Sequence, residues 1–265
     1  MFEYDFMRTA FAAGAVVAVV AGAVGFFLVL RNLTFAGHAL SHVGFAGATG
    51  AVLLGLDPLW GLLAFTLAAA VAMGCLGDRL RNRDVAVGIV LSLALGLGVL
   101  FLYLYTTSAS EATAILFGNL LGVDIAKLWS LVALGAATLA ALAAIARPLL
   151  FVSLAPEMAE AKGVSLRLVG VLFLAIVAVA VAEAAQIVGV LLVFALMVAP
   201  AAAAQRLSAR LGLGVALAVA LALAETWSGT ALAYATDLPP TFWIVLLSCL
   251  AYLASLAKPT GLARA

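Results

Sequence analysis

The residues best suited to chemistry in this chain are its two histidines, His38 and His42, in the run Gly37-His38-Ala-Leu-Ser41-His42-Val-Gly44. A spacing of four residues places both imidazoles on one face of a helix, about 6 Å apart at Cβ, where two nitrogen ligands can hold one metal ion. Imidazole favours zinc, copper, iron or nickel over calcium and magnesium. The spacing alone leaves two interpretations equally open. The rings contact a metal, or they form hydrogen bonds to neighbouring helices.

Two glutamates also lie in apolar runs, where an ionisable side chain costs at least ~2.5 to 3.5 kcal/mol on insertion scales. Glu225 is predicted in the outer half of its span, with Thr226 beside it. It either lines a transport pathway or is a neutral, hydrogen-bonded carboxyl group. Ser41 is a second candidate for the pathway wall. Glu183 is predicted to be a solvated carboxylate, because it lies close to Gln186 at an expected turn between two spans.

The elements that position these side chains follow from composition. The chain has 265 residues, of which 67% are hydrophobic and only 9% are charged. This excludes a water-soluble fold and predicts an all-α, polytopic integral membrane protein. The 13 Lys and Arg residues and 12 Asp and Glu residues give a net charge of +1. Because there is no basic excess, we expect no nucleic-acid partner.

Apolar runs long enough to cross a hydrocarbon core about 30 Å thick occur nine times. The predicted spans are residues 9–30, 34–55, 58–77, 85–105, 124–146, 167–184, 187–205, 212–235 and 240–257. An eight-span chain is the alternative, because only Glu183 to Gln186 divides residues 167–205. With the N-terminus outside, only Arg8 and Lys127 of the 13 basic residues fall outside, which supports nine spans and a cytoplasmic C-terminus.

The sequence predicts one membrane domain, residues 1–265, with no soluble module. It contains no GxxxxGK[ST] phosphate-binding motif, so an energy source other than an ion gradient must lie on a partner. Residues 153–163 are expected on the cytoplasmic side as a short helix that docks on such a partner. Ser153 suits its cap, Pro156 and Glu157 its first turn and Gly163 its end. A surface loop with helical form is an equally open interpretation.

Six stretches between about Arg31 and Lys258 resemble the permease subunit of the metal-ion class of ABC importers, which take up zinc, manganese and iron. These stretches are Thr34-Phe-Ala-Gly37-His38-Ala-Leu-Ser41-His42-Val-Gly-Phe-Ala-Gly47, Asp84-Val-Ala-Val-Gly88-Ile-Val-Leu-Ser92, Leu116-Phe-Gly118-Asn119-Leu-Leu-Gly122, Pro156-Glu157-Met-Ala-Glu160-Ala-Lys-Gly163, Gln186-Ile-Val-Gly189-Val-Leu-Leu-Val193 through Pro200-Ala-Ala-Ala-Ala204, and Asp237-Leu-Pro239-Pro240. Their common order and spacing carry the resemblance more than any single stretch does.

The resemblance implies a type II importer-like permease that forms a homodimer and works with two cytoplasmic ATP-binding subunits and an extracytoplasmic metal-binding protein. It implies that the segment with Pro156, Glu157, Glu160 and Gly163 docks on the ATPase. It also implies that His38 and His42 belong to the metal path. Many relatives carry Asp at the first of these two positions, and the nitrogen ligand here favours zinc over manganese.

We therefore expect an inner-membrane permease, without an enzymatic activity or a permanently bound cofactor, that moves Zn²⁺ into the cytoplasm. A manganese or iron importer is the first alternative. A stand-alone transporter that relays protons through Glu183 or Glu225 is the second, although no inverted repeat is evident in the sequence. An intramembrane metalloprotease is disfavoured, because Ala39 and Leu40 follow His38 and the His-Glu-x-x-His motif is absent.

Overall fold

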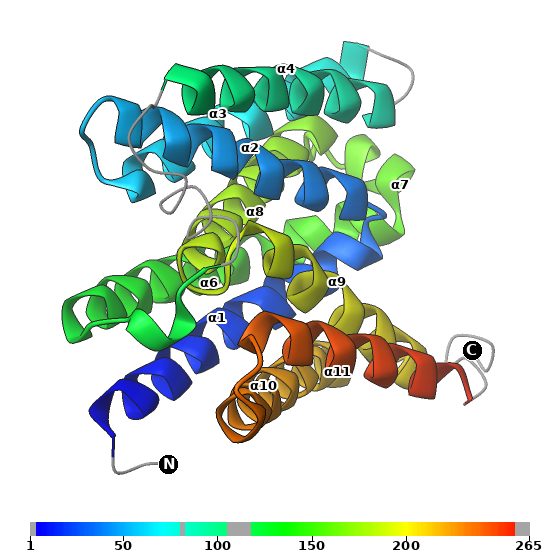
Figure 1. Cartoon of the computed structure of the whole chain (residues 1–265). Helices are drawn as coiled ribbons and strands as arrows, with labels where there is room; N and C mark the ends of the chain where they lie inside the picture. The colour runs from blue at the N-terminus through cyan, green and yellow to red at the C-terminus, as the bar shows by residue number, and fades with distance from the viewer. Residues whose placement is uncertain (1–3, 80–82, 105–117, 258–265) are drawn as a thin grey trace.

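Long apolar runs fold as helices because a helix pairs nearly all of its backbone N–H and C=O groups within one segment. The computed structural model describes residues 4–79, 83–104 and 118–257. This part of the chain holds long helices and no strand, so the all-α prediction is confirmed (Figure 1). The long helices are α1 (Asp5–Leu30), α2 (Thr34–Leu53), α3 (Pro58–Arg79), α4 (Arg83–Leu104), α6 (Ile125–Leu154), α8 (Leu166–Val188), α9 (Val190–Leu207), α10 (Leu211–Thr236) and α11 (Pro240–Leu256). A 3₁₀ turn, η1 (Leu120–Gly122), and a short helix, α7 (Pro156–Ala161), complete them.

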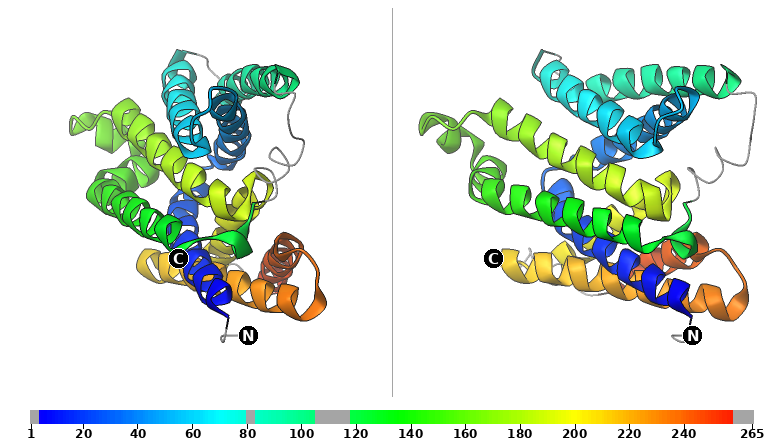
Figure 2. Two further views of the ribbon diagram at one scale, coloured as in Figure 1. Left: turned by 60° about the vertical axis from the view of Figure 1, so that its left-hand side comes forward. Right: turned by 90° about the vertical axis from the view of Figure 1, so that its left-hand side faces the viewer.

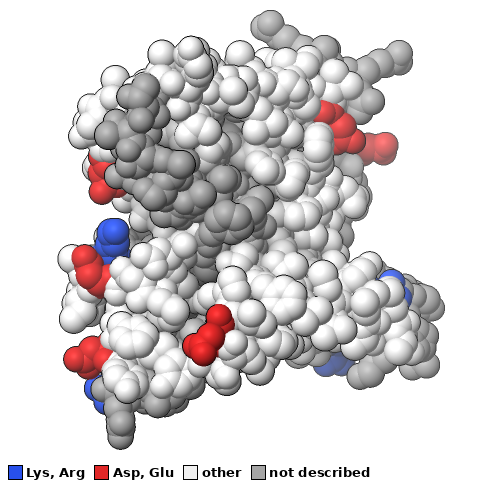
Figure 3. All heavy atoms as spheres, viewed as in Figure 1, with Lys and Arg blue, Asp and Glu red and all other residues white. Residues whose placement is uncertain are grey.

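The helices are long and apolar enough for a multi-pass membrane protein. In the described part of the chain, six helices meet the length and hydropathy of a membrane span, namely α1, α3, α4, α6, α8 and α10. Helices α9 and α11 are apolar but shorter. Figure 3 shows charged side chains mainly toward two ends of the molecule, with a broad uncharged band between them. A bilayer fits this band, because hydrocarbon excludes charged groups.

Basic residues mark one end of the bundle. Arg31 follows α1, Arg167 lies in the first turn of α8, and Arg206 lies in the last turn of α9. The Gln205 amide donates a hydrogen bond of 2.8 Å to the Phe26 carbonyl, which brings the ends of α9 and α1 together. We call this the basic end; α7 lies at the same end, where α6 meets α8 (Figure 2). Arg81, Lys258 and Arg264, on which the predicted orientation also depends, lie outside the described residues.

Two groups of helices pack on either side of α8. Helices α2, α3 and α4 lie together on one side, and α9, α10 and α11 on the other, as Figures 1 and 2 show. Helix α8 contacts α1, α2, α3, α6 and α9. The histidines on α2 and the glutamate on α10 therefore belong to different groups.

Glycines allow the helices that carry the site to approach closely. A Cβ on Gly47 of α2 would collide with the Gly61 carbonyl of α3, and a Cβ on Gly25 of α1 would collide with the Met197 carbonyl of α9. Small residues serve this purpose in membrane bundles, where close backbone packing replaces the hydrophobic effect as the driving force. The positions of α2 and α9 are thus fixed by backbone contacts.

The boundary between α8 and α9 differs from the prediction. Helix α8 continues through Glu183 and Gln186 to Val188. The helix ends at Gly189, whose φ of 79° and ψ of 156° are open essentially to glycine alone. The polar residues did not end the helix because Glu183 is buried by neighbouring helices. Helix α6 likewise runs past its predicted end near Ala146, through Pro148, to Leu154.

Candidate metal centre

The two histidines lie together on α2. Their ring centroids are 4.7 Å apart and the ring planes meet at 81°, an edge-to-face contact. Both side chains are half-buried. The predicted placement of His38 and His42 on one helix face is what the structure has, and the pair offers imidazole nitrogens one turn apart.

A phenylalanine from α9 completes this cluster of rings. The Phe194 ring centroid lies 4.8 Å from that of His38, at an interplanar angle of 68°. The His38 Nδ1 atom is buried and has no hydrogen-bond partner. Sequence reasoning missed Phe194, because nothing in an apolar run distinguishes one of its aromatic residues from the others.

Ser41 lies on α2 between the two histidines and is buried. Its side chain is only 1% exposed, and its hydroxyl donates a hydrogen bond of 3.1 Å to the Gly37 carbonyl in the same helix. This hydrogen bond satisfies the hydroxyl proton within the helix and leaves the oxygen lone pairs free.

The described part of the chain contains no cluster of three or more His, Cys, Asp or Glu residues that could hold a metal. The histidine pair therefore offers two ligands from one chain. Transition metals such as zinc take four or more ligands in stable protein sites. Two imidazoles alone suit a site that holds an ion weakly, unless water or a second chain supplies the rest.

Glu225 is buried elsewhere. It is 4% exposed, its Oε2 accepts a hydrogen bond from Ser248 of α11, and its Oε1 has no hydrogen-bond partner. Helix α10 packs against α1, α9 and α11, whereas α2 packs against α3, α4, α8 and α9. The structure does not bring Glu225 together with the histidines, and its surroundings favour the hydrogen-bonded carboxyl over a pathway ligand.

Glu183 corrects the sequence interpretation. It was expected in a solvated turn but is 1% exposed within α8, and neither carboxyl oxygen has a hydrogen-bond partner. A Cβ on Gly135 of α6 would lie 2.8 Å from Glu183 Oε1 and 3.1 Å from Val16 Cγ1 of α1. The carboxyl group thus fills a notch between α1 and α6 that the missing side chain of Gly135 leaves open.

The short helix α7 occupies the place of the predicted docking segment. It begins at Pro156 and has Glu157 in its first turn, and Gly163 follows with a φ of 81°. Glu157, Met158 and Glu160 are exposed, whereas Ala159 is buried. Ser153 is not its cap, since it lies inside α6 and donates a hydrogen bond to the Leu149 carbonyl.

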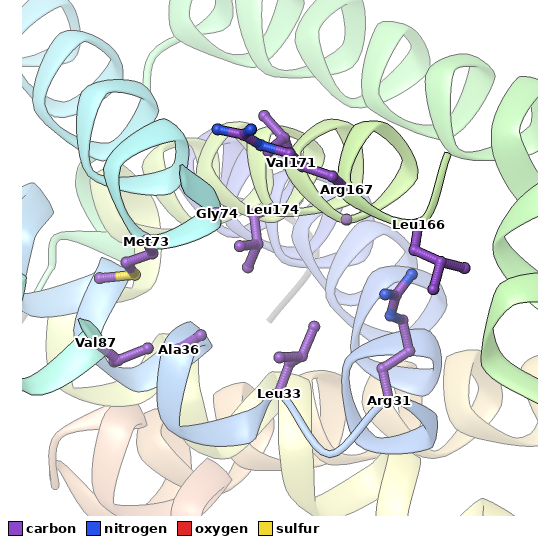
Figure 4. Close-up of a pocket in the computed structure, with 11 residues that line it drawn as sticks. Arg31, Leu33, Ala36, Met73, Gly74, Val87, Leu166, Arg167, Val171 and Leu174 are labelled. Carbon is purple, nitrogen blue, oxygen red and sulfur yellow. The ribbon is translucent and has the colours of Figure 1, made fainter. Parts of the chain in front are cut away.

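A pocket at the basic end is lined by residues of α2, α3, α4 and α8 and by Arg31, which follows α1 (Figure 4). Arg31 and Arg167 both line it, and the Arg31 guanidinium lies 5.6 Å from the centroid of the Phe173 ring. Neither histidine lines this pocket. The pocket lies where the ends of these helices meet, and Ala36 brings the first turn of α2 into its wall.

The model of the ABC 3 transport family matches residues 3–259. The chain belongs to the ABC 3 transport family. The predicted family is thereby confirmed, and the match includes the histidine pair, α7 and the α8 to α9 junction.

Two relatives are similar to this chain in sequence, and one solved structure is similar to it in fold. The manganese import system permease protein ScaB of Streptococcus pneumoniae is 29% identical over 167 residues, 63% of this chain and 59% of ScaB. This chain thus spans less than two thirds of that relative. A probable metal transport system membrane protein of Treponema pallidum is 30% identical over 94% of this chain and 93% of the relative. The structure of PsaBC from Streptococcus pneumoniae in complex with Fab matches with a TM-score of 0.85 at 28% identity, over 96% of this chain and 91% of that chain.

Proposed function

We propose that this ABC 3 family chain is the membrane-spanning permease subunit of an ATP-driven importer for a divalent transition metal ion. The observation that carries the proposal is the histidine pair, with rings 4.7 Å apart on a helix of a multi-pass bundle. A dipositive ion crosses hydrocarbon only if ligands replace its hydration shell, weakly enough to release it again. Two half-buried imidazoles without a third ligand from the described residues meet that requirement.

The assembly proposed here follows from what the chain lacks. Two imidazoles per chain become four if two copies face each other across a homodimer axis, and four is the usual ligand number for zinc. The sequence has no phosphate-binding motif of its own, so ATP hydrolysis belongs to cytoplasmic ATP-binding subunits, two per dimer, with α7 as their docking element. An extracytoplasmic protein delivers the metal. The basic end faces the cytoplasm of the inner membrane, as the positive-inside rule predicts.

The metal is argued from the ligands. Nitrogen donors suit zinc, whereas carboxylate and water suit manganese, so the histidine pair supports Zn²⁺. The curated relative from Streptococcus pneumoniae is named for manganese, which supports Mn²⁺ as the second candidate. Uptake of Zn²⁺ and Mn²⁺ by the same vesicles, alone and in competition, separates the two.

Replacing both histidines tests the proposal. In vesicles that contain the chain and its ATP-binding subunit, we expect His38→Ala with His42→Ala to reduce ATP-dependent uptake by at least about 100-fold, because both ligands are lost. Thr49→Val is the control, since this α2 hydroxyl bonds only to carbonyls of its own helix. Normal uptake by the double variant, at a normal amount of protein in the membrane, would refute the assignment.

A further inference from the structure

The candidate metal centre contains three aromatic rings in a row: Phe194 contacts His38, and His38 contacts His42. The centroid distances are 4.8 Å and 4.7 Å, with interplanar angles of 68° and 81°. Both are edge-to-face contacts, the arrangement in which the positive edge of one ring meets the negative face of another. His38 is thus the middle ring, in contact with one aromatic ring on each side.

The orientation of His38 lacks the support that metal-binding histidines usually have. Such a histidine normally donates its second ring N–H to a carboxylate, a carbonyl or water, which fixes both the tautomer and the ring plane. The buried Nδ1 of His38 has no carboxylate or carbonyl partner among the described residues. The contact from α9 that sets the plane of the His38 ring is its packing against Phe194.

Helix α9 holds Phe194 firmly. Val193, Leu196 and Met197 flank Phe194 and are at most 1% exposed, while Phe194 itself is half-buried. The Met197 carbonyl lies against Gly25 of α1 at a distance that leaves no room for a Cβ. The backbone under Phe194 is thus anchored from α1, and the ring it carries toward α2 has a defined position.

We propose that Phe194 is a positioning residue for metal binding: its ring holds the His38 imidazole in the plane from which His38 and His42 act together on the ion. This inference rests on the proposed function of the histidine pair. Phe194 itself contacts no metal in this account. It acts by removing rotational freedom that His38 would otherwise lose only when the ion binds.

The expected effect is confined to affinity. Loss of the aromatic edge frees the His38 ring, so more metal is needed to order both ligands, whereas the later steps of transport are unchanged. An edge-to-face pair contributes an amount that corresponds to about 3- to 10-fold in binding. A purely structural role for Phe194 would instead lower the amount of active protein and the maximal rate.

The first experiment measures ATP-dependent uptake against Zn²⁺ concentration in vesicles that contain the chain and its ATP-binding subunit. We expect Phe194→Leu to raise KM by about 3- to 10-fold with little change in the maximal rate, and Phe194→Tyr, which keeps the ring, to restore the wild-type KM. Phe65→Leu is the matched control, because Phe65 forms an edge-to-face pair with Phe101, 6.1 Å between centroids, and touches neither histidine. An unchanged KM in Phe194→Leu, or a fall in maximal rate alone, would overturn the inference.

The second experiment needs no transport and so covers a variant that transports poorly. The chain has only two histidines, so a chain labelled at histidine shows two imidazole environments by NMR. During a Zn²⁺ titration of the full chain in detergent, we expect both signals to respond together in the wild type. In Phe194→Leu the His38 signal should need about 3- to 10-fold more Zn²⁺. Identical titrations of the two proteins would contradict the positioning role.

The two proposals fail in different ways. If wild-type signals do not respond to Zn²⁺ or Mn²⁺, and the double histidine variant transports normally, the proposed function is wrong. If the histidine variants lose uptake while Phe194→Leu binds and transports with wild-type KM, the proposed function stands and the role of Phe194 is wrong.

Discussion

Two buried glutamates show how much the surroundings of one side chain decide. Glu225 receives a hydrogen bond from Ser248 across the α10 to α11 interface, whereas the carboxyl oxygens of Glu183 have no hydrogen-bond partner and one of them lies beside Gly135 of α6. A buried polar group without a hydrogen-bond partner costs free energy, so these two surroundings differ in how well they accommodate a carboxyl group. Among the described residues, no hydrogen bond links the two glutamates to each other or to the histidine pair.

Ser248→Ala is expected to destabilise the protein by about 1 kcal/mol, because Glu225 loses its interhelical donor and hydrogen bonds of this kind in membrane bundles contribute up to ~1.7 kcal/mol. Thermal unfolding in detergent measures the difference as a lower Tm. Ser255→Ala is the matched control on the same helix, since the buried Ser255 hydroxyl donates to the Tyr252 carbonyl of its own helix. Equal shifts in the two variants would contradict an interhelical role for Ser248.

At the scale of single residues, the sequence predicted the histidine pair but not the surroundings of Glu183. The four-residue spacing of His38 and His42 was sufficient, because helix geometry alone places them together. The burial of Glu183 was not predictable, because it depends on helices that pack against α8 from elsewhere in the sequence, such as α6 with Gly135. Phe194 was missed for the same reason.

At the scale of elements, the α8 to α9 junction sets where the second half of the bundle begins. Gly189 ends α8 and starts α9 with a φ of 79°, and a Cβ on Gly118 would collide with the backbone of Val188 and Gly189. The sequence held this signal, since a glycine followed Gln186 by three residues. Glu183 and Gln186 predict a boundary only if they are exposed, and Glu183 is buried. Most of the other boundaries followed from apolar length and agree with the structure within a few residues.

Gly189→Ala is expected to lower stability by about 1 to 3 kcal/mol, because an alanine is strained at this φ and ψ. Chemical or thermal denaturation in detergent measures the loss. Gly96→Ala in α4 provides the opposite control: a Cβ there meets nothing within 4 Å, and alanine in a helix interior adds roughly 0.5 to 1 kcal/mol. If Gly189→Ala were as stable as the wild type, the junction would tolerate another backbone geometry.

At the scale of the whole molecule, composition and the length of the apolar runs were enough to predict a multi-pass helical bundle, because runs of about 20 apolar residues cross a bilayer as helices. Composition does not predict which subunits bind the chain. The contact surface that we propose for them is the exposed part of α7, where Glu157, Met158 and Glu160 are exposed and Ala159 is buried. Two carboxylates on one turn predict a basic complement on the partner.

Reversal of both charges tests this surface. Glu157→Lys with Glu160→Lys should reduce recovery of the ATP-binding subunit with the purified chain by at least about tenfold, because like charges would then face each other. Asp5→Lys, an exposed reversal at the opposite end of α1 from the basic end, should leave recovery unchanged. Unchanged recovery with the α7 variant would place the docking surface elsewhere.

The join between α6 and α7 has a mechanical consequence. Ala155 is at once the residue that ends α6 and the residue that precedes α7, so a single pair of backbone torsions separates the two axes. No linker separates the two helices, so a displacement of α7 is passed directly to α6. Such a displacement either changes the backbone torsions at Ala155 or tilts α6, a helix of 30 residues that reaches from the basic end to the far side of the bundle.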